Sequence, residues 1–138
     1  MSFVSLTRDD FDKCLRPKGF RTDWVRSELI YTLNHKKDPS YRVIVYTSIK
    51  FGSNVTDAIG RDAIRSCAVR TIGNQTIGIA STTRVNRTGS VQKVLARTLT
   101  RLREAYDTCN RVIQQNIACK RSNERHGIHL TDIYHVVL

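Results

Sequence analysis

A long amphipathic stretch in the second half of the chain constrains the fold more than any other feature. Apolar side chains recur there at spacings of three and four, with charged side chains on the opposite side. The apolar positions are Val91, Val94, Leu95, Leu99, Leu102, Tyr106, Cys109 and Ile113. This period predicts one helix over residues 90–117, about 40 Å long at 1.5 Å per residue, with Ser90 as its N-cap. A stripe of this length needs a broad apolar partner, and a β-sheet provides one.

The residues before this helix predict that sheet. Residues 41–50 alternate strictly, so that one side carries Tyr41, Val43, Val45, Thr47 and Ile49 and the other Arg42, Ile44, Tyr46, Ser48 and Lys50. Three further strands are predicted over residues 20–34, 63–71 and 76–87. The inward positions of the first are Trp24, Leu29, Tyr31 and Leu33. Successive strands joined by short turns favour an antiparallel meander.

A short helix is predicted at the start of the chain, over residues 6–16. Ser5 or Thr7 supplies the N-cap, acidic residues fill the first turns, and Pro17 ends the helix. The expected fold class is α+β: a short N-terminal helix, a four-stranded antiparallel sheet, a long C-terminal amphipathic helix packed on one sheet face, and a strand-like tail. We expect a single domain over residues 1–138, with a core at 1–119 and a tail at 120–138 that acts as an edge strand or an oligomerisation segment.

The charge of the chain indicates its class of partner. The 138 residues include 23 Lys and Arg against 12 Asp and Glu, which gives a formal net charge of +11. Residues 84–125 alone hold ten basic and three acidic residues, a net of +7. Such an excess is typical of proteins that bind a polyanion, most often nucleic acid. We therefore expect a sequence-nonspecific, non-catalytic protein that binds single-stranded DNA or RNA.

Two groups of residues are the candidate binding site. Arg84, Arg87, Lys93 and Arg97 flank the connection from the last predicted strand to the long helix, where free backbone N–H groups and the helix dipole also favour phosphate. Lys50, Arg61, Arg65 and Tyr46 belong to the sheet face that the helix leaves open or to the loop beside it. There Tyr46 supplies a stacking platform flanked by cations.

Other residue patterns exclude several functions. Cys14, Cys67, Cys109 and Cys119 lack a C-x-x-C spacing, so we interpret them as reduced core thiols. The chain shows no secretory signal and no apolar run long enough to cross a bilayer, so we expect a cytoplasmic protein without a membrane partner. Cys119 and the histidines near the C-terminus match no standard zinc spacing, and no nucleotide-binding motif occurs. We therefore expect neither a metal nor a cofactor.

Two alternative functions stay open. The acids available to a small metal-dependent nuclease are Asp57 and Asp62, with Glu28 and Asp23 on the first predicted strand. Asp57 and Asp62 with Lys50 or Arg65 are the candidate site. The strand-like residues 128–138 are suited to docking on the sheet edge of a neighbouring subunit, which would make the chain an assembly protein and a homo-oligomer.

The order of elements over residues 20–115 resembles two groups of nucleic-acid-binding proteins. One is the double-stranded RNA-binding domain, which has three strands between two helices. The other is the core of the single-strand annealing recombinases, in which a β meander precedes a long helix that lines a basic groove. The second is the nearer resemblance, since this chain is longer than the first and has one more strand. It implies that Arg84, Arg87, Lys93 and Arg97 line such a groove.

Overall fold

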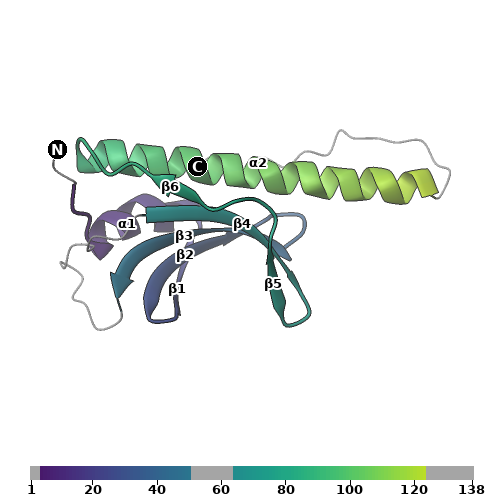
Figure 1. Ribbon diagram of the computed structural model, residues 1–138, viewed down its shortest axis with the longest axis horizontal. Helices are drawn as coiled ribbons and strands as arrows, with labels where there is room; N and C mark the ends of the chain where they lie inside the picture. Colours follow the sequence, from purple (N-terminus) through teal and green to yellow (C-terminus); the bar gives the residue numbers. More distant parts are fainter. Residues whose placement is uncertain (1–3, 51–63, 124–138) are drawn as a thin grey trace.

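The computed structural model describes residues 4–50 and 64–123, and the side chains of these ranges as far as residue 116. Helix α1 (Arg8–Leu15) leads through a single 3-10 turn, η1 (Arg16–Lys18), into an antiparallel sheet, and the long helix α2 (Val91–Asn123) follows the sheet (Figure 1). The helices and the sheet form two layers. The predicted α+β class is therefore confirmed.

A capping box starts α1. The Thr7 hydroxyl oxygen accepts a hydrogen bond from the backbone N–H of Asp10 at 3.2 Å, and the Asp10 carboxylate accepts one from the backbone N–H of Thr7 at 2.9 Å. These two bonds satisfy N–H groups that a helix start otherwise leaves without partners. The chain leaves η1 at Gly19, whose φ of 95° suits glycine.

The sheet contains β1 (Arg21–Val25), β2 (Glu28–Asn34), β3 (Tyr41–Lys50), β4 (Ile64–Ile72), β5 (Gln75–Gly78) and β6 (Thr83–Val85). Its spatial order is β1-β2-β3-β4-β5, with every pairing antiparallel. β6 also pairs with β4, alongside residues 64–66, while β5 pairs with residues 69–72. β5 and β6 thus share one edge of β4, as the predicted meander requires.

The sheet differs from the prediction in two places. The segment 20–34 is a hairpin of β1 and β2, and its turn residues Arg26 and Ser27 have φ of 50° and 65°. Two successive positive φ values are typical of a two-residue hairpin turn, which Asn-Gly usually forms. The Arg-Ser sequence gives no such signal, so the turn was not predicted. The predicted strand 76–87 is split into β5 and β6, because residues 79–82 leave the ladder.

The long helix is confirmed at its start and extends further than predicted. Ser90 caps it, since its hydroxyl oxygen accepts from the backbone N–H of Lys93 at 3.2 Å. It continues to Asn123, six residues past the predicted end at residue 117. The polar residues 120–123 include neither Gly nor Pro, so they change the polarity of the helix without stopping it.

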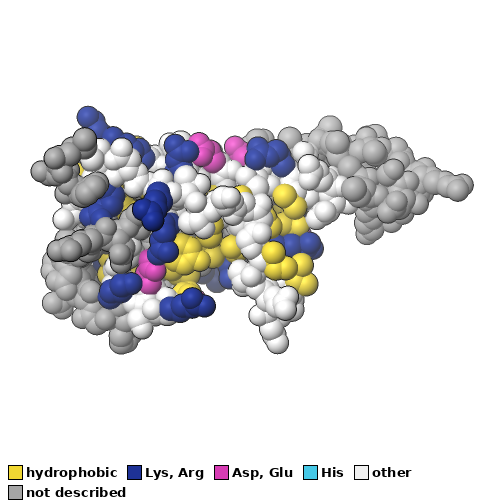
Figure 2. Space-filling view, viewed as in Figure 1, with side chains coloured by type: hydrophobic (Ala, Val, Ile, Leu, Met, Phe, Trp, Pro, Cys, Tyr) yellow, Lys and Arg dark blue, Asp and Glu magenta, His cyan; other side chains and the backbone are white. Residues whose placement is uncertain are grey.

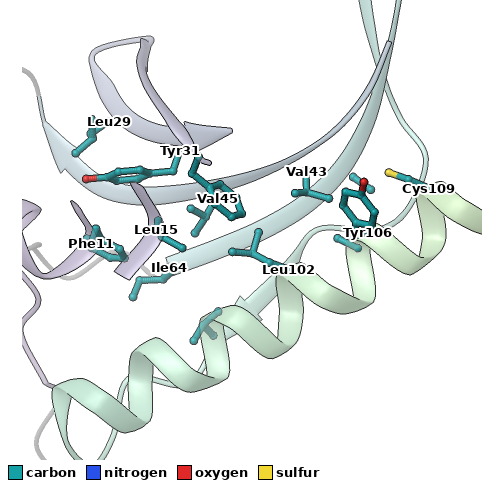
Figure 3. Packing of buried hydrophobic residues seen from close by; sticks show 14 of the residues in the cluster. Phe11, Leu15, Leu29, Tyr31, Val43, Val45, Ile64, Leu102, Tyr106 and Cys109 are labelled. Carbon is teal, nitrogen blue, oxygen red and sulfur yellow. The ribbon is translucent and has the colours of Figure 1, made fainter. Parts of the chain in front are cut away.

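The hydrophobic core lies between one face of the sheet and both helices (Figure 3). Val43 and Val45 on β3 and Leu102 on α2 are fully buried in it. At the other end of the core, Phe11 of α1 lies 5.9 Å from the Tyr31 ring of β2. Both helices therefore cover the same sheet face, whose inward positions agree with the predicted alternation. Among the described residues, no helix is long and apolar enough to span a membrane.

Leu102→Ala tests the packing of α2 on the sheet. Leu102 is fully buried, so the truncation should lower the free energy of unfolding by about 2–5 kcal/mol in urea denaturation. Leu102→Met keeps the side-chain volume and should cost less than about 1.5 kcal/mol. A loss below about 1 kcal/mol for Leu102→Ala would show that α2 does not pack as described.

Candidate functional site

The register of the sheet aligns a row of side chains on the face away from α2, here called the open face. Asp23 of β1 pairs with Ile30 of β2, Ile30 with Tyr46 of β3, and Tyr46 with Arg65 of β4. Arg65 in turn pairs with Arg84 of β6. Directly opposed residues in antiparallel strands share a face. This row therefore brings Tyr46, Arg65 and Arg84 together, although the sequence analysis assigned Arg84 to a different group.

The open face is concave. A hollow of about 910 Å³ is lined by residues from Arg21 on β1 to Thr76 on β5, so both edges of the sheet bend toward this face. Ile30 and Ile44 line the hollow. Together with Cys67 and Val69 they form a buried apolar cluster, here called the apolar floor, against which Tyr46 packs. No described helix packs on this face. Figure 2 shows hydrophobic side chains over the middle of the sheet beneath α2, with Lys and Arg side chains beside and below them.

Arginines surround this floor. Arg21, Arg26 and Arg42 line the hollow, and Arg84 is exposed beside Arg65. Within the part of the chain that the structure describes, none of these four arginines makes an ion pair. Cations without acidic partners keep their full attraction for an incoming anion.

Arg65 differs from the other arginines because Glu28 of β2 holds it. Its Nη2 donates to both carboxylate oxygens of Glu28, at 2.9 Å and 2.8 Å. Its Cζ lies 4.9 Å from the centroid of the Tyr46 ring, which is a cation–π contact. Glu28 also accepts a 2.8 Å hydrogen bond from the backbone N–H of Ser48. Ser48 has a φ of 66° and lies opposite the place where the register of β2 and β3 shifts, as it does at a β-bulge. Such bulges re-aim side chains, often next to functional sites.

The two titratable groups on the floor are uncharged at neutral pH. Burial, with a smaller effect of Cys67, raises the pKa of the Tyr46 phenol above its ordinary value of 10.0. Burial also raises the pKa of the Cys67 thiol, against opposing effects of the Tyr46 hydroxyl and Arg65. The floor therefore stays apolar and neutral. The charge of the hollow resides on four arginines and on two acids, Asp23 and Glu28, so it is positive on balance.

Of the four cations predicted at the strand–helix connection, two are exposed and two are held by contacts within the chain. Arg84 and Lys93 are exposed. Arg87 is only 6% exposed, and its Nη2 donates to the carbonyl oxygen of Val4 at 3.2 Å. Burial also lowers its pKa. Arg87 therefore attaches the N-terminal segment and is not available on the surface where the sequence analysis placed it.

Arg97 also serves the chain itself. Its Nη1 donates to the carbonyl oxygen of Asn86 at 3.1 Å and to that of Thr88. These bonds stabilise the connection between β6 and α2, so the guanidinium is partly committed to structure. Of the remaining predicted residues, Lys50 is exposed at the end of β3, and Arg61 lies outside the described residues.

A second, smaller hollow of about 370 Å³ lies between α2 and β4. Its wall carries Arg101 and Glu104, whose side chains form an ion pair at 2.7 Å, together with Asp107 and Arg111. Positive and negative side chains are balanced there. This hollow therefore offers a polyanion no net attraction, in contrast to the open face.

The nuclease hypothesis rested on Asp57 and Asp62, which lie outside the described residues. Among the residues that are described, no three His, Cys, Asp or Glu side chains gather as metal ligands do. Residues 128–138, on which the assembly hypothesis rested, also lie outside the described part.

Three features of the site were not predicted from the sequence: Arg21, Arg26 and the pairing of Arg65 with Glu28. A single strand over residues 20–34 does not predict the sheet face of Arg21, because the segment is a hairpin of β1 and β2. Arg42 was placed on the same face as Tyr46 by simple alternation, and the structure agrees. The Glu28–Arg65 pair joins residues 37 positions apart, and no local pattern signals such a contact.

No protein-family model matches this chain, and the comparisons with curated proteins and with solved structures found no match. The resemblance to the single-strand annealing recombinases and to the double-stranded RNA-binding domain therefore stays a prediction.

Cysteine alkylation tests the burial of the core and of the floor. Cys14, Cys67 and Cys109 are free thiols, and only Cys14 is partly exposed. Burial raises the pKa of Cys109 to about 11, so little of it is thiolate at a pH of about 8.5. Iodoacetamide should label Cys14 well before Cys67 and Cys109 in the native protein, as peptide mass mapping would show. Equal rates in guanidinium are the control; equal rates in the native protein would contradict the described burial.

Proposed function

We propose that this protein binds single-stranded nucleic acid, without sequence preference, on the concave open face of its sheet. The observation that carries the proposal is the arrangement of Arg21, Arg26, Arg42 and Arg84, which have no acidic partners among the described residues, around an apolar floor. Phosphates and bases need these two kinds of surface side by side.

The arginines supply the attraction for phosphate. Each phosphate neutralised by a cation releases counterions, so affinity falls linearly with the logarithm of salt concentration, by about 0.7 per contact for single strands. The net charge of +11 adds long-range attraction that speeds association. Contacts to phosphate carry no sequence information, which is why we infer binding without sequence preference.

The apolar floor favours single strands. In a duplex the bases are paired and stacked, so their flat faces cannot reach the apolar residues of the hollow, Ile30 and Ile44. In a single strand the bases are free to turn toward apolar or planar side chains and stack on them. The partly exposed Tyr46 and the Arg65 guanidinium lie on that floor.

DNA and RNA are both accommodated by this chemistry, since backbone charge and base stacking are common to the two. A cytoplasmic location and self-association remain predictions of the sequence. The nuclease and assembly alternatives depend on residues outside the described part of the chain, and no contact described above favours either of them.

Arg84 and Arg87, three positions apart, give a matched test. Arg84→Ala removes an exposed cation and should reduce the slope of log affinity against log salt by about 0.7 for a short oligothymidylate, with the free energy of unfolding unchanged.

Arg87→Met removes a buried donor and should instead lower the free energy of unfolding by about 1–3 kcal/mol, with the salt slope of the folded protein unchanged.

Arg103→Ala is the control for charge alone, because Arg103 is exposed on α2, away from the open face. It lowers the net charge by the same amount as Arg84→Ala. Fluorescence anisotropy titrations at several salt concentrations measure all three variants. Equal slopes for Arg84→Ala and Arg103→Ala would show that the open face is not the binding surface, and absence of binding by the native protein would refute the proposal itself.

A further inference from the structure

The geometry points to a specific task for Arg65: we infer that its guanidinium is a plate on which a nucleic-acid base stacks, rather than a phosphate contact. This inference rests on the proposed function and assigns a role within the same site. It departs from the general expectation that every arginine in a basic site binds phosphate.

The charge of Arg65 is already compensated. Both oxygens of Glu28 accept from its Nη2 within 2.9 Å, and the Glu28 side chain is only 12% exposed. A guanidinium paired so closely with a carboxylate contributes little net field at the distance of an approaching phosphate. A phosphate at this place would also meet the negative charge of Glu28.

Glu28 accepts from Nη2 alone, and the partly exposed outer side of the guanidinium is where a planar ligand would stack. One side of it lies over the Tyr46 ring, 4.9 Å from the centroid, and 37% of the Arg65 side chain is exposed. Bases stack on arginine planes as well as on aromatic rings. A base on the outer side of Arg65 would lie above the Arg65–Tyr46 contact, and Tyr46 in turn packs against the apolar floor.

The orientation of this plate is fixed before any ligand arrives. Glu28 accepts from the backbone N–H of Ser48 at 2.8 Å as well as from Arg65. Ser48 holds a positive φ that is uncommon outside glycine. Because Glu28 is anchored to the backbone of β3, it acts as a positioning residue that holds the Arg65 guanidinium above Tyr46. A pre-oriented group loses less freedom on binding.

Arg84 completes the site for one nucleotide. It is the direct cross-strand neighbour of Arg65, it is exposed, and it makes no ion pair within the described ranges. Opposed residues on one face lie about 5 Å apart at Cβ. One nucleotide can therefore place its base on Arg65 and its phosphate on Arg84. In this arrangement Arg84 binds the phosphate through its charge, and Arg65 binds the base by stacking.

Comparison of two ligands of equal charge tests this inference. One is a ten-nucleotide oligothymidylate, and the other is an abasic strand of the same length. Arg65→Lys keeps the positive charge but removes the plane. We expect it to weaken oligothymidylate binding by roughly five- to hundredfold, the effect of losing one stacked base, and to leave abasic binding within about twofold. Arg84→Ala should weaken binding of both strands alike.

Glu28→Gln provides a second variant with an opposite signature. It frees the charge of Arg65 and releases its orientation. Abasic binding should become tighter, with a salt slope steeper by about 0.7, while the preference for the strand with bases shrinks. Thermal unfolding of each variant confirms that it is folded before its affinity is compared.

Three results would overturn the inference. Equal losses of affinity for both strands in Arg65→Lys would show that Arg65 contacts phosphate. No loss of affinity for either strand would show that Arg65 is not part of the binding site. An unchanged salt slope in Glu28→Gln would show that Glu28 does not mask the charge. In each case salt-dependent binding by the native protein would leave the proposed function intact, whereas failure of the native protein to bind either strand would refute both.

Discussion

The packing of the apolar stripe of α2 on one face of the sheet is the interaction on which the rest of the structure depends. It buries Val94, Leu102 and Cys109 against β3 and β4, and α1 extends the same layer through Phe11 and Tyr31. Because both helices occupy one face, the alternating side chains of β1 to β4 present their other face without a helical cover in the described part. The concave surface that we propose to bind nucleic acid is a consequence of this one-sided packing.

The role of each arginine depends on the residues that surround it in the fold and not on its position along the chain. Arg87 is buried against the carbonyl oxygen of Val4, and Arg97 binds carbonyl oxygens of the connection before α2. Arg65 is neutralised by Glu28, whereas Arg84 and Arg42 have no acidic partner among the described residues. Net charge therefore overstates the number of cations available to a ligand. We propose the open face as the binding surface because its arginines lie around an apolar floor. The hollow beside α2 has equal numbers of basic and acidic side chains and lacks this combination.

The periodicity of the sequence predicted the features that depend only on residues close together along the chain. The stripe of α2 and the alternation of Tyr41 to Thr47 depend on residues a few positions apart, and both are present. An N-cap was predicted at Ser5 or Thr7, and the structure has it at Thr7. The Arg26–Ser27 turn was missed because its left-handed backbone is set by the pairing of β1 with β2 rather than by Gly or Asn. The burial of Arg87 and the Glu28–Arg65 pair were missed because both follow from long-range contacts, which depend on how strands register in space.

Protection of arginine side chains from chemical modification tests the central claim most directly. Phenylglyoxal labelling, with and without a saturating single-stranded oligonucleotide, is quantified for each arginine by mass spectrometry. The account predicts that Arg42 and Arg84 lose reactivity when the oligonucleotide is bound, while the exposed Arg103 and Arg111 of α2 keep theirs. Protection of Arg103 and Arg111 with undiminished labelling of Arg42 and Arg84 would place the ligand on the helical side and contradict it.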